Sequence, residues 1–204
     1  LFRSHHYAHA EYIIHYSNLS KGIILVIDGS GTKEKDRELF NIKEKVDNKC
    51  KSYIDQSGKE TISAYSFDEK ELSLIYRFSL SADKNNQVNL SGNGFLQSIG
   101  HYWRWASNYC CGSHSEAGKV MGLAAFGNPE THKNLRILSL NDDGFLKVNY
   151  KKLNEIFKHP NFFGNDLTQN SHYSDVAAMV QEDTENILMK ILTILKKKYP
   201  TETL

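Results

Sequence analysis

Two histidines near the start of the chain have the spacing of metal ligands. His5 and His9 lie four residues apart, so on a helix their imidazoles fall on nearly the same face. By itself this pair is also typical of ordinary surface or core histidines, because His6 and His15 occur in the same segment. Asp28 favours a metal site, since it follows an apolar run, at the strand exit where functional residues of open α/β sheets collect. Two imidazoles and a carboxylate suit iron, zinc or manganese, and we expect a divalent ion, iron or zinc, at His5, His9 and Asp28.

The segment that begins at Asp28 could also bind phosphate. Gly29 and Gly31 let backbone N–H groups approach phosphate oxygens, beside a carboxylate that can hold a metal. The same residues are common in tight turns that bind nothing, and they match neither the P-loop nor the dinucleotide-binding glycine pattern. The alternatives are an ordinary turn and a different phosphate-binding architecture built from Asp28, Gly29, Ser30 and Gly31.

A third segment combines glycines with a pair of opposite charges. Glu116 and Lys119 lie three residues apart near a predicted helix start, where they can pair or meet a polar ligand. Gly118 and Gly122 permit close approach to the backbone. The alternative is a helix of small residues packed on a sheet, with an ion pair in solvent.

The elements that must position these residues follow from the hydrophobic pattern. An uninterrupted apolar run predicts a buried strand before Asp28, and apolar residues on one helical face predict a long final helix. Lys196 to Lys198 close that helix at the end where cations suit the helix dipole. The pattern predicts helices at about 5–16, 94–108, 117–125 and 174–198, strands at 22–27, 61–67 and 72–78, a hairpin over 135–149, a polar break at 83–87, and a solvated helix or mobile loop over 33–51.

Length and composition set limits on the class of protein. The 204 residues suffice for one ordinary domain and are short for two, so we expect a single α/β domain over 1–204. The formal net charge of +1 does not indicate nucleic acid as a partner. The sequence has no apolar run long enough for a membrane span and no signal peptide, which favours a cytoplasmic protein. The three cysteines, Cys50, Cys110 and Cys111, are expected to be reduced.

Three motifs together resemble a known family. The residues are His5-His-Tyr-Ala-His-Ala10, Val26-Ile-Asp-Gly29 and Glu116-Ala-Gly-Lys-Val-Met-Gly-Leu-Ala124, in this order. They resemble the O-carbamoyltransferases of the nodulation and antibiotic-biosynthesis (NodU/CmcH) type, and the final helix with Val176 to Ala178 and Gln181 is also similar to that family. The resemblance implies part of an actin/sugar-kinase/Hsp70-like (ribonuclease H-like) α/β domain, with a mixed sheet and packed helices.

The resemblance also implies a reaction in two steps. A YrdC-like domain makes carbamoyl-adenylate from carbamoyl phosphate and ATP, and the domain to which this chain is similar passes the carbamoyl group to a hydroxyl of a small-molecule or glycan acceptor. His5, His9 and Lys119 would be catalytic, and His5, His9 and Asp28 would hold the metal. The residues that would contact ATP or the adenylate are Asp28, Gly29, Ser30, Gly31, Glu116, Gly118, Lys119 and Gly122.

This sequence departs from the family pattern in what it lacks. It has neither the family's opening strands, nor the later glycine-rich stretch with a further metal-binding Asp, nor a YrdC-like domain. We therefore expect the middle portion of the catalytic domain, inactive alone and prone to form homo-oligomers through uncovered sheet edges. The alternatives are a non-enzymatic nucleotide- or metal-binding module or an inactive remnant of the same fold. A simple metal hydrolase is disfavoured, because no separate base or nucleophile accompanies the ligands.

Overall fold

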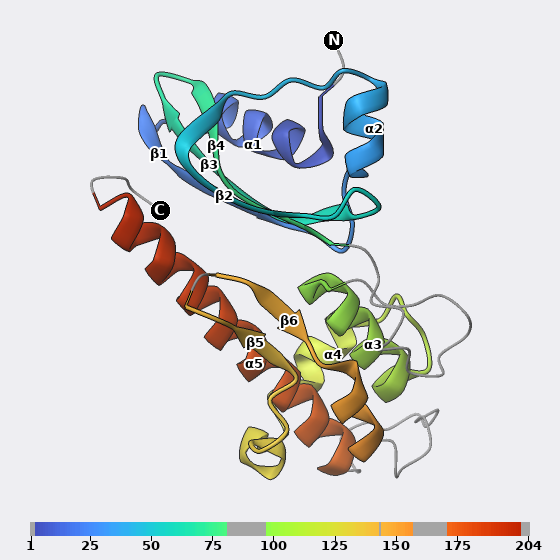
Figure 1. The fold of residues 1–204 in the computed structure, drawn as a ribbon. Coiled ribbons are helices and arrows are strands. Elements are labelled where there is room, and N and C mark those ends of the chain that lie inside the picture. Colours follow the sequence, from blue (N-terminus) through green and yellow to red (C-terminus); the bar gives the residue numbers. More distant parts are fainter. Residues whose placement is uncertain (1–2, 81–96, 143, 157–170, 201–204) are drawn as a thin grey trace. The chain divides into compact units, whose positions relative to one another are not determined.

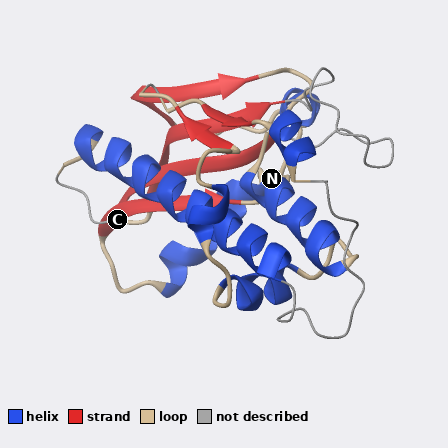
Figure 2. Ribbon diagram, turned by 90° about the horizontal axis from the view of Figure 1, so that it is seen from below, coloured by secondary structure: helices blue, strands red, loops and turns tan. Residues whose placement is uncertain are grey.

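The computed structural model describes residues 3–80, 97–142, 144–156 and 171–200, and these form the mixed helices and strands of an α/β protein (Figures 1 and 2). They fall into two compact units. Unit 1 contains the described residues up to 80, residues 97–98 and those from 191 onward, and unit 2 contains those from 99 to 190. Two compact units are compatible with one domain over 1–204, which stays a prediction.

Unit 1 is built on a four-stranded mixed sheet with the strand order β1-β3-β4-β2. Strand β3 pairs antiparallel with both β1 and β4, whereas β2 pairs parallel with β4. The helix α1 lies against the sheet (Figure 1). Its elements are α1 (His5–Tyr16), β1 (Lys21–Ile27), α2 (Glu34–Leu39), β2 (Val46–Ile54), β3 (Lys59–Asp68) and β4 (Glu71–Leu80). The expected first helix, the three expected strands and the expected mixed sheet are confirmed.

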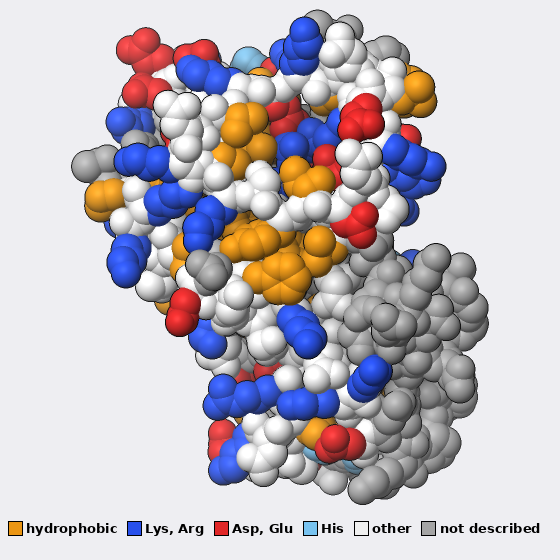
Figure 3. Space-filling view, viewed as in Figure 1, with side chains coloured by type: hydrophobic (Ala, Val, Ile, Leu, Met, Phe, Trp, Pro, Cys, Tyr) orange, Lys and Arg blue, Asp and Glu red, His pale blue; other side chains and the backbone are white. Residues whose placement is uncertain are grey.

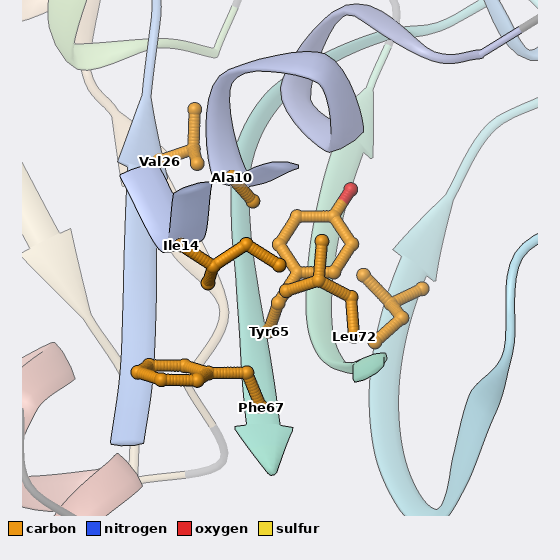
Figure 4. Packing of buried hydrophobic residues seen from close by; sticks show 7 residues of the cluster. Ala10, Ile14, Val26, Tyr65, Phe67 and Leu72 are labelled. Atoms are coloured by element: carbon orange, nitrogen blue, oxygen red, sulfur yellow. The ribbon is translucent and has the colours of Figure 1, made fainter. Parts of the chain in front are cut away.

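The packing of α1 on the sheet decides which of its faces stays open. Ala10 and Ile14 are buried and point toward Val26 of β1 and toward Tyr65 and Phe67 of β3 (Figure 4). Together with His6 they form a buried stripe at a spacing of four. His5 and His9 each precede a residue of this stripe by one position. They therefore lie on the neighbouring face of α1, and both are exposed.

The segment 33–51 differs from its prediction as a solvated helix or mobile loop. Its first part is the helix α2, but Glu34 and Arg37 of that helix are buried rather than solvated. Its second part belongs to β2, an edge strand that pairs only with β4 and keeps most of its side chains exposed. An edge strand needs no apolar alternation, because neither face is fully covered, and its charged residues therefore gave no strand signal.

Unit 2 contains the remaining predicted helices and the hairpin. Its elements are α3 (Ile99–Cys111), α4 (Ala117–Ala124), η2 (Pro129–His132), β5 (Leu138–Leu140), β6 (Leu146–Val148), η3 (Tyr150–Glu155) and α5 (Ser171–Lys198), the last of which continues into unit 1. Strands β5 and β6 pair antiparallel, so the hairpin is confirmed, with shorter strands than expected. The predicted break at 83–87 and residues 94–96 lie outside the described residues.

Aromatic side chains form the core that α3 brings to unit 2. Tyr102, Trp105 and Tyr109 are buried, and their rings stack with centroids 6.0 Å and 5.5 Å apart. Val176 and Val180 of α5 are buried in the same unit. One face of α3 is thus apolar and covered, as the aromatic-rich sequence predicted.

Surface properties agree with the sequence where they can be compared. Acidic and basic side chains both occur on the face shown in Figure 3. Among the described residues, no helix combines the length and the apolar character needed to cross a membrane. Cys50, Cys110 and Cys111 are free thiols.

Candidate metal centre

The structure brings His5, His9 and Asp28 together in unit 1. The Nε2 atom of His5 lies 2.7 Å from Oδ2 of Asp28 and 3.1 Å from Nε2 of His9. One ligand atom from each residue lies within 4.8 Å of the other two. The side chains of His5 and Asp28 are 48% and 35% exposed, so molecules in solution can reach the group. We call these three residues the triad.

The donor atoms of the triad fit a divalent transition metal. Two imidazole nitrogens and one carboxylate oxygen converge on one point, and this donor set is one that zinc and iron accept. Three protein ligands and an accessible surface leave room for a further ligand, as in catalytic rather than closed structural sites. Among the described residues this is the one group of His, Cys, Asp or Glu side chains with such a geometry.

Asp28 is ionised under neutral conditions, as a metal ligand must be. Partial burial alone would raise the pKa of its carboxyl group. The hydrogen bond from the backbone N–H of Gly29 and the hydrogen bond and charge of His5 outweigh that effect, so the pKa lies below its usual value. The carboxylate is therefore available to a cation without first losing a proton.

His6 follows His5 in sequence, but its side chain points into the protein. Its side chain is fully buried, and its Nδ1 atom lies 2.9 Å from Oγ of Ser63, to which it is hydrogen-bonded. Its Nε2 atom has no hydrogen-bond partner among the described residues. Burial lowers the pKa of His6 to about 4, so the ring is neutral at pH 7. His6 belongs to the packing of α1 rather than to the triad.

The loop after β1 is held by the sheet through its own backbone. The N–H of Asp28 donates to the carbonyl of Thr61, and the N–H of Gly31 donates to the carbonyl of Glu60, at 2.9 Å and 2.7 Å. A Cβ atom at Gly31 would lie 2.5 Å from Cγ of Glu60, so this position requires glycine for close approach. The glycine thus has a structural reason, and phosphate binding by residues 28–31 stays a prediction.

The second predicted group lies on α4 in unit 2. Nζ of Lys119 lies 3.0 Å from Oε2 of Glu116, one turn earlier, and the lysine side chain is 61% exposed. The N–H of Glu116 donates to Oγ of Ser107 at 2.7 Å, which fixes the start of the helix. Among the described residues, no atom other than those of the adjoining residues and the helix's own backbone lies within 4 Å of the position that a Cβ would take at Gly118 or Gly122. Packing therefore does not require these glycines, and they leave the helix surface open.

Two glycines of this region should respond in opposite ways to replacement by alanine. At Gly127 the new methyl group would overlap the backbone of Ser174, so Gly127→Ala should lower the free energy of unfolding by about 1–3 kcal/mol. Gly118→Ala meets no atom and improves helix propensity, so it should raise that energy by about 0.5–1 kcal/mol. Urea denaturation followed by circular dichroism measures both changes. Equal effects of the two variants would show that packing does not distinguish the two positions.

Sequence reasoning missed a buried charge cluster in the same unit as the triad, formed by Glu34, Arg37, Glu44, Glu60 and Arg77. The guanidinium of Arg37 pairs with Glu60 and lies 3.0 Å from Glu44, and Arg77 pairs with Glu44. The side chains of Arg37, Glu44, Glu60 and Arg77 are between 0% and 8% exposed. One signal was visible in the sequence, because an arginine inside the apolar run 72–78 must find an acidic partner when the strand is buried.

The comparison with protein families gives one match. The family model described as "Carbamoyltransferase N-terminus" matches residues 1–204. No curated protein matches the chain.

Proposed function

Because this chain belongs to the carbamoyltransferase N-terminal family, we propose that it is a portion of an ATP-dependent O-carbamoyltransferase. In the complete enzyme the reaction transfers a carbamoyl group from carbamoyl-adenylate to a hydroxyl of a small-molecule or glycan acceptor. The adenylate is made from carbamoyl phosphate and ATP by a YrdC-like domain of the same enzyme. Within the structure, the observation that supports this proposal is the triad on α1 and directly after β1.

The triad supports group transfer because of its position and its chemistry. His5 and His9 supply imidazole nitrogens from an exposed helix face, and Asp28 supplies a negative oxygen. These residues would hold a divalent ion, zinc or iron. Such an ion supplies Lewis acidity that polarises a carbonyl group or binds adenylate oxygens.

The arrangement and exposure of the triad side chains also suit the transfer step. The Asp28 carboxylate lies 2.7 Å from Nε2 of His5, so two of the proposed ligand atoms already face one another. The exposed face lets the acceptor hydroxyl and the activated carbamoyl group approach together, which is the condition for efficient transfer.

Residues of α4 are proposed to contact the nucleotide. Lys119 carries an exposed ammonium group that can bind phosphate oxygens as a point charge, while Glu116 holds it in place at rest. Gly118 and Gly122 leave the surface of the helix open to a ligand. With Asp28, Gly29, Ser30 and Gly31, these residues make up the proposed nucleotide-binding set.

The experiment separates transfer from activation in the complete enzyme. His9→Ala and Lys119→Ala should each lower the carbamoylated product by about 100-fold or more, because each removes charge stabilisation at the reacting groups. ATP consumption by the activating domain should fall far less in His9→Ala. The matched controls are His15→Ala, exposed on the same helix, and Lys133→Ala, whose 3.0 Å pair with Glu130 repeats the spacing of the Lys119 pair. Undiminished product in His9→Ala and Lys119→Ala would remove these residues from the site.

A further inference from the structure

We propose that Glu60 is a positioning residue for the metal site, because its buried carboxylate joins the helix that carries His5 and His9 to the loop that carries Asp28. This inference rests on the proposed function of the triad and extends it to a residue that offers no ligand. The hydrogen bonds that meet at this one side chain support it.

Both oxygens of the Glu60 carboxylate are occupied by groups from other elements. Oε1 accepts the backbone N–H of His6, at 3.1 Å, and the backbone N–H of Thr32, at 3.0 Å. Oε2 accepts from the guanidinium of Arg37 in α2. The side chain is fully buried, so water does not compete for these bonds. One carboxylate therefore fixes the first turn of α1 and the end of the loop after β1 in the same place.

The backbone and side chains around Glu60 strengthen this connection. The N–H of Glu60 donates to the carbonyl of Thr32 at 3.0 Å, and its own carbonyl accepts from Gly31 at 2.7 Å. Oγ1 of Thr32 accepts the N–H of His5 at 2.8 Å, which adds a direct bond between the loop and the first ligand. Gly31 has no room for a side chain because Cγ of Glu60 lies against it.

The N-terminus of α1 is consequently closed by protein groups. The N–H groups of His5, His6 and Tyr7 donate to Thr32, Glu60 and Ser4, and the N–H of Ala8 donates to the carbonyl of Ser4. The bonds of His5, His6 and Tyr7 satisfy three of the four backbone donors that have no partner within the helix, and the bond of Ala8 is the first bond of the helix itself. A carboxylate at this end also suits the helix dipole. These hydrogen bonds fix the orientation of α1 about its axis and its position along that axis. They therefore fix where the side chains of His5 and His9 lie relative to Asp28.

Stability alone does not explain a carboxylate at this point. Replacing a buried ion pair by well-packed apolar residues is often neutral or stabilising, so a charged cluster is not the strongest way to fill a core. Groups behind metal ligands commonly orient them, and their loss lowers metal affinity by about 10- to 100-fold. Glu60 lies behind the triad in this sense, because it binds the backbone of both segments that carry the proposed ligands.

The test compares Glu60→Gln with a core variant in the full chain. Glu60→Gln keeps the shape, but its one acceptor oxygen cannot serve both Arg37 and the N–H groups of His6 and Thr32, so it should weaken Zn²⁺ binding about 10- to 100-fold in calorimetry. It should also change the visible absorption spectrum of bound Co²⁺, which reports ligand geometry. Ile75→Ala removes a buried side chain from β4, a strand that carries none of the three triad residues, and it should lower stability while leaving affinity and spectrum unchanged.

Each outcome supports or overturns the positioning role. Wild-type affinity and spectrum in folded Glu60→Gln would overturn it and leave the triad intact. Equal losses in Ile75→Ala would show that any destabilisation has this effect and would overturn it as well. If Glu60→Gln does not fold, Thr32→Val removes the bond to His5 while keeping the buried ion pairs, and unchanged zinc affinity there would count against the proposal. A wild-type chain that binds no zinc would instead contradict the proposed function itself.

Discussion

Replacing His5 and His9 together by alanine is expected to abolish the binding of Zn²⁺ by this chain. Their Nε2 atoms lie 3.1 Å apart, and both converge with Asp28, so the double variant retains one of three ligands. Loss of a group behind a metal ligand already costs about 10- to 100-fold in affinity, so loss of two ligands should cost more than about 100-fold. Calorimetric titration and elemental analysis of the untagged chain measure the effect.

The control for this experiment lies on the same helix. His15 is exposed near the end of α1 and belongs to no metal-binding group among the described residues, so His15→Ala should bind zinc as the wild-type chain does. The double variant should keep its fold, because both histidines are exposed and alanine favours a helix. Equal zinc content in the wild-type chain and a folded double variant would eliminate the proposed ligands.

The second large effect concerns stability, at the buried charge cluster. Arg37→Ala should lower the free energy of unfolding by about 3–5 kcal/mol, because it leaves the fully buried carboxylate of Glu60 without its cation. It also removes the 3.0 Å contact with Glu44. Urea denaturation at pH 7, followed by circular dichroism, measures the change.

Exposed ion pairs of the same unit provide the comparison. Lys45 and Glu71 lie 2.9 Å apart, but their side chains are 58% and 68% exposed, so solvent screens the pair. Lys45→Ala should therefore change stability by less than about 1 kcal/mol. A change in Arg37→Ala as small as that in Lys45→Ala would mean that the buried cluster contributes little to stability, contrary to the expected result.

Acidification should weaken the same cluster. Burial alone would raise the pKa of Glu44, but Arg77 and Arg37 outweigh it and hold the pKa below its usual value of 4.5. The stabilisation from this carboxylate is therefore complete above about pH 4.5 and is lost as the pH falls through the lowered pKa.

The parts of unit 1 with a strong hydrophobic pattern are predictable from the sequence. The continuous apolar run before Asp28 forms β1, and the spacing of Ala10 and Ile14 matches the buried face of α1. Given those two elements, the approach of His5 and His9 to Asp28 follows from helix periodicity and from the end of the strand. Both features depend on local spacing, which a sequence displays directly.

The parts that depend on distant partners are not predictable in the same way. Strand β2 carries charged residues because it is an edge strand, and only its pairing with β4 reveals it. Glu34 and Arg37 resemble a solvated surface until the fold brings Glu44 and Glu60 to them from other elements. A charged residue can be buried only where the fold supplies a partner of opposite charge. For Arg37 that partner, Glu60, lies 23 residues away along the chain.

His5, His9 and Asp28 are proposed to hold the metal ion of a carbamoyl-transferring enzyme, and the location of a bound ion tests this most directly. The measurement is an anomalous difference map from crystals of the chain grown with Zn²⁺, with data collected on both sides of the zinc edge. We predict one strong peak, bound by Nε2 of His5, Nε2 of His9 and a carboxylate oxygen of Asp28. A peak at other side chains, with these three residues free of zinc, would contradict the claim.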